Sequence, residues 1–267
     1  MAILKGPIQF DGSLGDVRSY YDKDAKKQVL STKGGCNKNQ LENNESLVNV
    51  VHTNREFSAC SMMAKLIRKG TFDLVYLKNG RIQGKLISIV KSIQNMLNED
   101  PWGFRKIAIS RFNYPLIGFC MNNAHPFKTV FHVEPELTVT ENRQVVTLRL
   151  SNFISSERFK WPERVMYYRI FLNIFEMPDI EWLKGWDQYY PVYQPATLGN
   201  KTMVSNWLSI STEPIDFQLT ADFGENHIPR EKTVVLVSMG LEFASGMQFN
   251  TPFVVKDHGT MAIVGCF

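Results

Sequence analysis

Two groupings of side chains in this sequence have the types and spacing to do chemistry, and the first is a cluster of cations. Residues 55–111 contain 11 Lys and Arg side chains against 4 Asp and Glu side chains. Gathered on one face, such cations neutralise several phosphate groups, which is the electrostatic requirement for nucleic-acid binding. The side chains assigned to this site are Lys65, Arg68, Lys69, Arg81, Lys85 and Lys91. The competing interpretation is that they are the solvated faces of amphipathic helices.

The second grouping is aromatic. Residues 182–193 hold two Trp and three Tyr side chains mixed with Gly and Pro, and they lie between predicted strands, so we expect a long loop. Amphipathic rings anchor protein interfaces and also stack on sugars. The competing interpretation is that the rings fold back to cover the end of a β core. The contact patch is assigned to Trp182, Trp186, Tyr189, Tyr190 and Tyr193.

Motifs of catalysis and of metal binding are absent from the sequence. It has no P-loop, no dinucleotide-binding glycine pattern, no H-E-x-x-H, no G-x-S-x-G and no C-x-x-C. Residues 12–15 (Gly-Ser-Leu-Gly) lack the Lys-Ser/Thr of a phosphate loop, and a hairpin bend explains them. The five His residues do not form an obvious ligand pair. We therefore expect a protein that is not an enzyme and uses no metal or other cofactor.

Cysteine usage and the absence of targeting signals bear on the cellular compartment. Four scattered cysteines, Cys36, Cys60, Cys120 and Cys266, predict reduced thiols rather than a disulfide framework. No window approaches the roughly 18 uninterrupted apolar residues of a membrane helix. The N-terminal residues lack the apolar region and the cleavage site of a signal peptide. The sequence thus predicts a soluble, cytoplasmic protein without a membrane span.

A β-hairpin is predicted near the N-terminus, over residues 8–30 and onward to residue 32. Residues 17–21 are rich in β-branched and aromatic types, residues 22–27 form a polar turn, and residues 28–32 return as the next strand. So small a sheet is marginal in water, so we expect it to dock on the rest of the chain or on another molecule. Its contact side chains are assigned as Phe10, Leu14, Val17 and Tyr20.

Helical periodicity marks the middle of the chain. Apolar residues at spacings of three and four predict one long helix or a helix pair over residues 47–67, with Gly70 as a C-cap. Arg68 and Lys69 then suit the negative end of the helix dipole. A second helix is predicted over residues 84–97.

From residue 129 onward the pattern changes to short runs enriched in β-branched and aromatic residues. The predicted strands are residues 129–133, 137–139, 144–150, 166–175, 202–210, 216–221, 233–243 and 253–256. Seven or eight such strands suggest an antiparallel β-sandwich of the immunoglobulin-like kind. The fold class is therefore α+β: an N-terminal β-hairpin, a helical middle segment and this C-terminal sandwich.

Charge is spread unevenly along the chain. Residues 1–125 carry 18 Lys and Arg against 10 Asp and Glu, whereas residues 126–267 carry 12 against 16. The resulting net charges, +8 and −4, support a boundary near residues 122–127. We expect a basic hairpin-plus-helix domain over residues 1–125 and an acidic β domain over residues 126–267.

The N-terminal residues resemble the start of a family of uncharacterised Bacteroidetes proteins. The pattern is Gly6-Pro7-Ile8-x-Phe10-x-Gly12-Ser13-Leu14-Gly15-x-Val17-x-x-Tyr20, closed by Ser31-Thr32-Lys33-Gly34-Gly35. In that family a short Gly-rich hairpin precedes a helical segment and a β-rich C-terminal half. The resemblance implies a bacterial setting and carries over no catalytic residues.

These patterns favour a non-enzymatic structural or protein-interaction protein, such as a subunit of a homo- or hetero-oligomeric assembly. The hairpin would pair edge-to-edge with another subunit, and the aromatic residues would add a contact patch. The alternative is nucleic-acid binding by the basic central helices. Carbohydrate binding by the Trp/Tyr stretch is the third hypothesis.

Overall fold

The computed structural model of the chain falls into two compact units, Met1–Val51 and His52–Phe267. It describes residues 2–3, 10–22, 26–32, 43–80, 82–97, 99–249 and 251–267, without the side chains of residues 2, 3, 72 and 256–258. Several features of the sequence lie outside these residues: Cys36, Arg81, residues 8–9 and 23–25 of the predicted hairpin, and the Gly6-Pro7-Ile8 start and Lys33-Gly34-Gly35 end of the family-like pattern.

The domain boundary expected near residues 122–127 lies inside the second unit. There Asn122 is buried and donates hydrogen bonds to the backbone oxygens of Leu77 and Gly259. This part of the chain thus joins the helical residues to the β residues within one unit.

The first unit is built around a four-stranded sheet with the order β1-β4-β3-β2. Its strands are β1 (Ala2–Ile3), β2 (Gly12–Leu14), β3 (Val17–Asp22) and β4 (Lys27–Thr32), and all neighbours are antiparallel. The predicted strand pair 17–21 and 28–32 is confirmed. Gly15, with a φ of 58°, adopts the left-handed conformation that the tight β2–β3 turn requires.

Two α-helices cover the second unit's main sheet. A 3-10 turn, η1 (Glu45–Leu47), leads into α2 (Val48–Gly70), which is the single long helix of the two predicted alternatives. The 3-10 segment η2 (Phe72–Leu77) connects it to α3 (Gln83–Met96), close to the predicted 84–97. In the described part of the chain, no helix combines the length and the apolar character that crossing a membrane requires.

The main sheet has the strand order β10-β7-β13-β14, and the short strand β11 also pairs with β7. These strands are β7 (Tyr167–Pro178), β10 (Asn200–Val204), β11 (Leu208–Ser209), β13 (Thr233–Gln248) and β14 (Thr251–Cys266). A second antiparallel sheet, ordered β12-β6-β5, contains β12 (Ile215–Asp222), β6 (Val145–Phe153) and β5 (Glu136–Val139). The α+β combination of helices and antiparallel sheets is confirmed.

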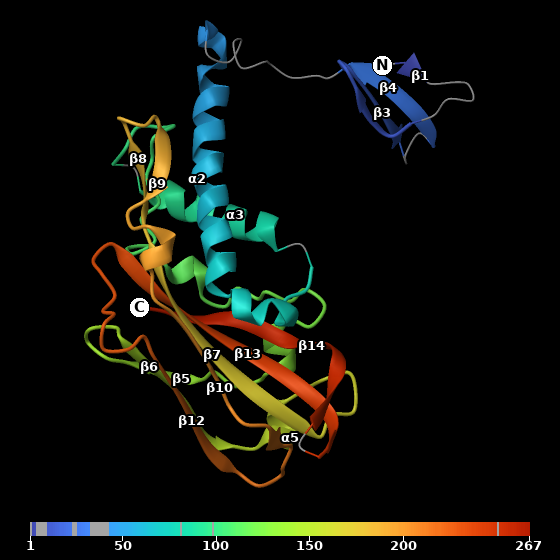
Figure 1. Cartoon of the computed structure of the whole chain (residues 1–267), viewed down its shortest axis with the longest axis vertical. Helices are drawn as coiled ribbons and strands as arrows, with labels where there is room; N and C mark the ends of the chain where they lie inside the picture. The colour runs from blue at the N-terminus through green and yellow to red at the C-terminus, as the bar shows by residue number, and fades with distance from the viewer. Residues whose placement is uncertain are drawn as a thin grey trace. The chain divides into compact units, whose positions relative to one another are not determined.

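Strands β7 and β13 form a middle layer, with helices on one side and the β12-β6-β5 sheet on the other (Figure 1). Because side chains alternate along a strand, Phe175 and Met177 of β7 pack with the helices, whereas Leu172 and Ile174 pack with β6. A strand covered on both faces is buried at successive positions, and most of its side chains are apolar. This explains the uninterrupted burial of residues 170–180.

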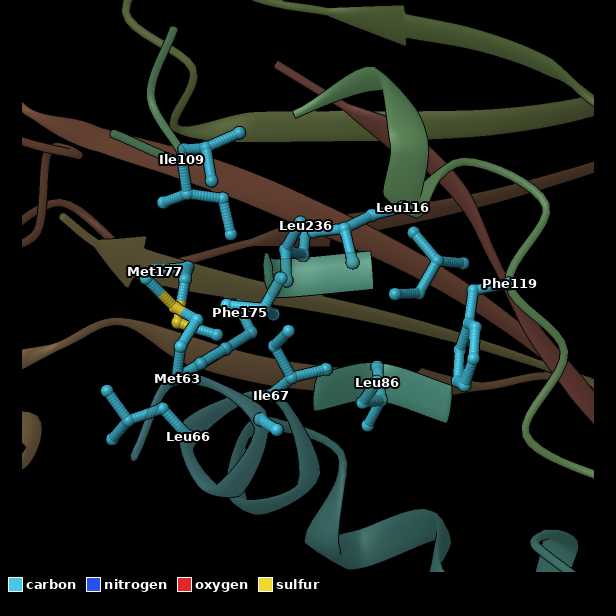
Figure 2. Packing of buried hydrophobic residues seen from close by; sticks show 14 of the residues in the cluster. Met63, Leu66, Ile67, Leu86, Ile109, Leu116, Phe119, Phe175, Met177 and Leu236 are labelled. Atoms are coloured by element: carbon cyan, nitrogen blue, oxygen red, sulfur yellow. The ribbon is translucent and has the colours of Figure 1, made fainter. Parts of the chain in front are cut away.

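Figure 2 shows how the helices fit against the sheet: Met63 and Ile67 of α2 and Leu86 of α3 converge on Phe175 and Leu236. Met63 and Leu86 are fully buried. Full burial of a large apolar side chain contributes about 1.5–3 kcal/mol, so this layer stabilises the unit strongly.

One predicted strand is wrong. Residues 129–133 were expected to be extended, but Phe127–Val130 form a short helix, α4. The backbone oxygen of Pro126 accepts hydrogen bonds from the amides of Thr129 and Val130 and from the Thr129 hydroxyl. These local bonds close a helical turn where the β-branched composition alone suggested a strand.

The other strand predictions are confirmed, with 202–210 divided into β10 and β11. The short helical elements η3 (Tyr114–Leu116), α5 (Ser155–Arg158) and η4 (Pro195–Thr197) complete the second unit's connections.

The contact between α2 and β7 leaves no space for a side chain at Gly70. A Cβ atom there would lie 2.1 Å from Cδ1 of the Phe175 ring, which is itself packed in the core. We expect Gly70→Ala to lower the free energy of unfolding by about 3 kcal/mol or more, because overpacking displaces this ring.

Gly84→Ala in α3 is the matched control, since nothing lies within 4 Å of its added Cβ. It should leave stability unchanged or slightly raised. Urea unfolding followed by circular dichroism measures both variants. Equal stability of the two would contradict the packing described here.

Candidate functional site

The aromatic stretch forms a β-hairpin, and the prediction of a long loop over residues 182–193 is wrong. Strand β8 (Ile180–Leu183) pairs antiparallel with β9 (Gln188–Pro191). Trp182 lies opposite Tyr189, with ring centroids 5.0 Å apart. Asp187, with a φ of 47°, adopts the left-handed conformation that closes the turn. Cross-strand aromatic pairing thus stabilises strands in a segment whose Gly and Pro residues had indicated a loop.

Two of the predicted contact rings fold back onto the helical layer. Tyr189 is buried, and its hydroxyl donates to the backbone oxygens of Gly103 and Arg105, at 3.2 and 3.1 Å. Burial raises the pKa of this phenol above its ordinary range. Trp182 packs edge-on against Phe104 at 5.1 Å, under the Arg55 guanidinium at 4.9 Å. These rings hold the hairpin in place.

Trp186 and Tyr190 remain at the surface. Trp186 is 70% exposed and lies edge-on to the Tyr190 ring at 5.6 Å. Tyr193 belongs elsewhere, because its ring lies 4.0 Å beneath the guanidinium of Arg230. The five predicted rings therefore divide into two anchor rings, a pair of one exposed and one half-buried ring, and one distant member. Phe104, which completes the anchor, is far away in the sequence and carried no signal.

A hollow of about 630 Å³ borders the anchor of the hairpin. Phe104 and Trp182 supply its apolar wall, and charges of both signs surround it, including Lys106, Glu181 and Asp187. Mixed charge beside aromatic rings suits a polar contact partner better than an anion alone.

A buried carboxylate holds the segment that receives the hairpin. Glu56 of α2 is fully buried, and Arg105 grips it with two hydrogen bonds, Nε to Oε1 at 2.7 Å and Nη2 to Oε2 at 2.6 Å. The Gly103 amide donates to Oε1 at 2.9 Å, and Lys91 donates to Oε2. Since Gly103 and Arg105 also accept the Tyr189 hydroxyl, Glu56 fixes the seat of the aromatic hairpin.

The pKa of Glu56 reflects this environment. Burial acts to raise it, but the hydrogen bonds from Arg105 and Lys91 outweigh burial and lower the pKa from 4.5 to about 2. The carboxylate is therefore ionised throughout the neutral range, where it balances two cations. A carboxylate held this way is a poor general acid or base at neutral pH.

The six side chains assigned to nucleic-acid binding do not lie together in the structure. Lys65, Arg68 and Lys69, on the last turns of α2, line a groove of about 930 Å³. Lys91 is committed to Glu56, and Lys85 donates instead to Asn123 Oδ1 at 2.7 Å. Arg81 lies outside the described residues.

Lys78 joins the basic groove, although it was not among the predicted residues. Its Nζ donates to the backbone oxygens of Thr71, at 2.5 Å, and Arg68, at 3.4 Å. The η2 segment brings it back to the C-terminal end of α2. Sequence periodicity does not reveal that return.

A second buried carboxylate, Glu176 of β7, was also missed. Its oxygens accept from His227 Nε2 at 2.8 Å, from the Arg230 amide at 2.9 Å and from the Gly199 amide at 3.2 Å. Burial acts to raise the Glu176 pKa, but the bonds from Arg230 and Gly199 keep it below its ordinary value. These bonds hold two connecting segments against the main sheet. His227 and Arg230 lie 51 and 54 residues after Glu176 in the sequence.

The predicted N-terminal contact residues do not share one face. In the antiparallel register Leu14 pairs with Val17, and the alternation along β3 places Val17 and Tyr21 on the same face. Tyr20 points to the opposite face, where the Arg18 guanidinium lies 5.1 Å from its ring. Phe10 is half-buried and precedes β2. Tyr21, which is 52% exposed, takes the place expected for Tyr20.

Catalytic or metal-binding groupings were sought among the described residues. They contain no cluster of three or more His, Cys, Asp or Glu side chains able to hold a metal ion. Burial raises the pKa of the Cys60 thiol to about 11 and that of Cys266 to about 12, which leaves both thiols unreactive. Comparison of the chain with models of protein families, with curated proteins and with solved structures finds no match.

Removing the charge of Glu56 should lower the stability of the fold. In Glu56→Gln, Arg105 and Lys91 lose their shared counter-ion in a mostly buried setting, so we expect a loss of about 3 kcal/mol in unfolding free energy. Glu99→Gln is the control, because this half-exposed carboxylate bonds Lys106 and Arg111 at the surface, where solvent screens the pairs, so its loss should change stability little.

The lowered pKa of Glu56 determines how the stability of the fold changes with pH. A folded-state pKa of about 2 against 4.5 gives stability that is present above 4.5 and is lost as the pH falls toward 2. Urea unfolding across this range should show a smaller loss in Glu56→Gln than in the unaltered chain. Identical acid profiles would contradict this role of Glu56.

Proposed function

We propose that this chain is a non-enzymatic subunit of an oligomeric assembly and that its N-terminal sheet makes the contact, with a second copy of the chain as partner. One observation carries the proposal. Among the residues of Met1–Val51 whose side chains are described, Val29 is the only apolar one that is buried, at 3% exposure. So few buried apolar side chains in the described part of the sheet favour a further apolar contact.

The energies of side-chain burial and of backbone ordering support the need for a further contact. Full burial of one valine contributes about 1.5–3 kcal/mol, whereas ordering the backbone of a single residue costs about 1–2 kcal/mol. The other two buried side chains, Ser19 and Gln28, are polar and hydrogen-bond to each other at 2.9 Å. Apolar contacts from outside the described side chains would stabilise the sheet further.

The β3 register supports one face of the sheet as the place of such contacts. Leu14, Val17, Tyr21 and Leu30 project from one face, and Leu14 is 73% exposed. All four are uncharged. Ser19 and Gln28 lie between them on this face and are buried, and Gln28 donates to Asp11 Oδ1, so the four apolar side chains surround a polar centre. Strand β2 is also an edge of the described sheet, with backbone groups that can pair with another strand. A symmetric, isologous contact uses the same patch on both copies.

The aromatic hairpin is a second contact patch under this proposal, through the exposed Trp186 and the partly exposed Tyr190. Carbohydrate binding by these rings stays a prediction. The immunoglobulin-like assignment also stays a prediction, supported by the two facing sheets β10-β7-β13-β14 and β12-β6-β5.

Leu14→Ser/Tyr21→Ser tests the proposed face. We expect the unaltered chain to form dimers or larger assemblies and this double variant to shift to monomer, because the apolar contact is lost. Size-exclusion chromatography with light scattering over a range of concentrations measures the change.

Ile228→Ser/Phe249→Ser is the matched control, because it removes two exposed apolar side chains from the second unit. It should leave the assembly intact. A chain that stays monomeric at every concentration, or an equal effect of both double variants, would rule out self-association through this face.

A further inference from the structure

The basic groove lies where the C-terminal end of α2 meets η2 and the start of α3. Lys65, Arg68, Lys69 and Lys78 supply four cations to its wall, and Ser61 and Gln83 add neutral polar groups. The groove encloses about 930 Å³. Positive charge is thus concentrated in a hollow rather than spread over a helix face.

These four cations differ from the other cations of the helical region. Lys91 and Arg105 pair with Glu56, and Lys106 and Arg111 pair with Glu99. Within the described part of the chain, none of the four groove cations forms an ion pair with a carboxylate. Asp73 acts electrostatically on Lys78, yet the groove keeps a net positive charge.

Part of the groove is held in place before any ligand arrives. Arg68 Nη1 donates to Gln83 Oε1 at 2.9 Å, which ties α2 to α3 across the groove. Lys78 is held by the backbone oxygens of Thr71 and Arg68. Burial and the neighbouring Arg68 lower the pKa of Lys78 to about 8. An anion beside this ammonium group would stabilise its charged form and raise its pKa again.

We propose that this groove binds the phosphate backbone of single-stranded nucleic acid. A flexible chain of phosphates can enter a hollow lined by cations, whereas a planar membrane surface cannot follow it. Ser61 and Gln83 can hydrogen-bond to phosphate or sugar oxygens. No aromatic ring lines the groove among the described residues, so base stacking adds little and binding is independent of sequence. This site is separate from the N-terminal sheet and does not depend on the proposed association.

The number of cations fixes the expected salt dependence. Four phosphate contacts on a single strand give a slope of about −2.8 for log K against log salt, because each contributes about −0.7. Affinity should therefore fall about 50-fold between roughly 50 and 200 mM salt. Fluorescence anisotropy of a dye-labelled oligothymidylate, titrated with the full chain, measures this.

Lys65→Glu/Lys69→Glu tests the location. Both side chains are exposed, so the fold should tolerate the change, and Arg68 and Lys78 keep their contacts. Lys128→Glu/Lys201→Glu alters net charge equally at exposed positions outside the groove. We expect the groove variant to lose about tenfold or more in affinity and the control to change little.

Alternative occupants are outcomes of the same titration. Absence of oligothymidylate binding at low salt, or equal losses in the two double variants, would overturn the proposal. Tighter binding of polyglutamate, or of vesicles containing phosphatidylserine, than of the oligonucleotide would also overturn it, since the groove would then serve an acidic protein or a membrane.

Lys78 provides a second, independent readout. Because its pKa is lowered to about 8, with Arg68 and Asp73 as the charged groups acting on it, affinity should weaken as the pH rises through that value. Lys78→Arg keeps its charge at those pH values and should show a flatter pH profile. Matching profiles of the unaltered chain and Lys78→Arg would contradict the role of Lys78 in the groove.

Discussion

Burial of strands β7 and β13 on both faces is the constraint on which the second unit depends. Helices α2 and α3 cover one face, and the β12-β6-β5 sheet covers the other. Close contact between these layers leaves no space for a side chain at Gly70, where the helix meets Phe175. It also fixes the end of α2 and, with it, the position of the cations that line the groove.

Two carboxylates in this apolar interior are compensated by several donors each. Glu56 and Glu176 are both completely buried, and each is surrounded by cationic and backbone donors. Each joins segments that are distant in the chain, because an unpaired buried carboxylate would be very costly. The aromatic hairpin depends on this compensation, since the residues that hold Glu56 also hold Tyr189.

Local periodicity was sufficient to predict α2, α3 and most strands, because one-sided or two-sided burial leaves a regular pattern in the residues. The charge count named Lys65, Arg68 and Lys69, and α2 places them on one helix face because they are three and four residues apart. These sequence patterns failed at the 182–193 hairpin, which a cross-strand ring pair stabilises, and at Lys91, which a distant glutamate neutralises. Lys78 and Phe104 reach their sites through tertiary contacts that no spacing encodes.

The small number of buried apolar side chains among those described in the N-terminal sheet is the central reason for proposing an assembly role for this chain. Hydrogen exchange of the backbone amides in β3 and β4, followed as protein concentration rises, tests it most directly. Self-association predicts that protection of these two strands increases with concentration while that of β13 stays constant. Protection of β3 and β4 that equals that of β13 at every concentration would show a sheet that is stable without a partner, and would contradict the proposal.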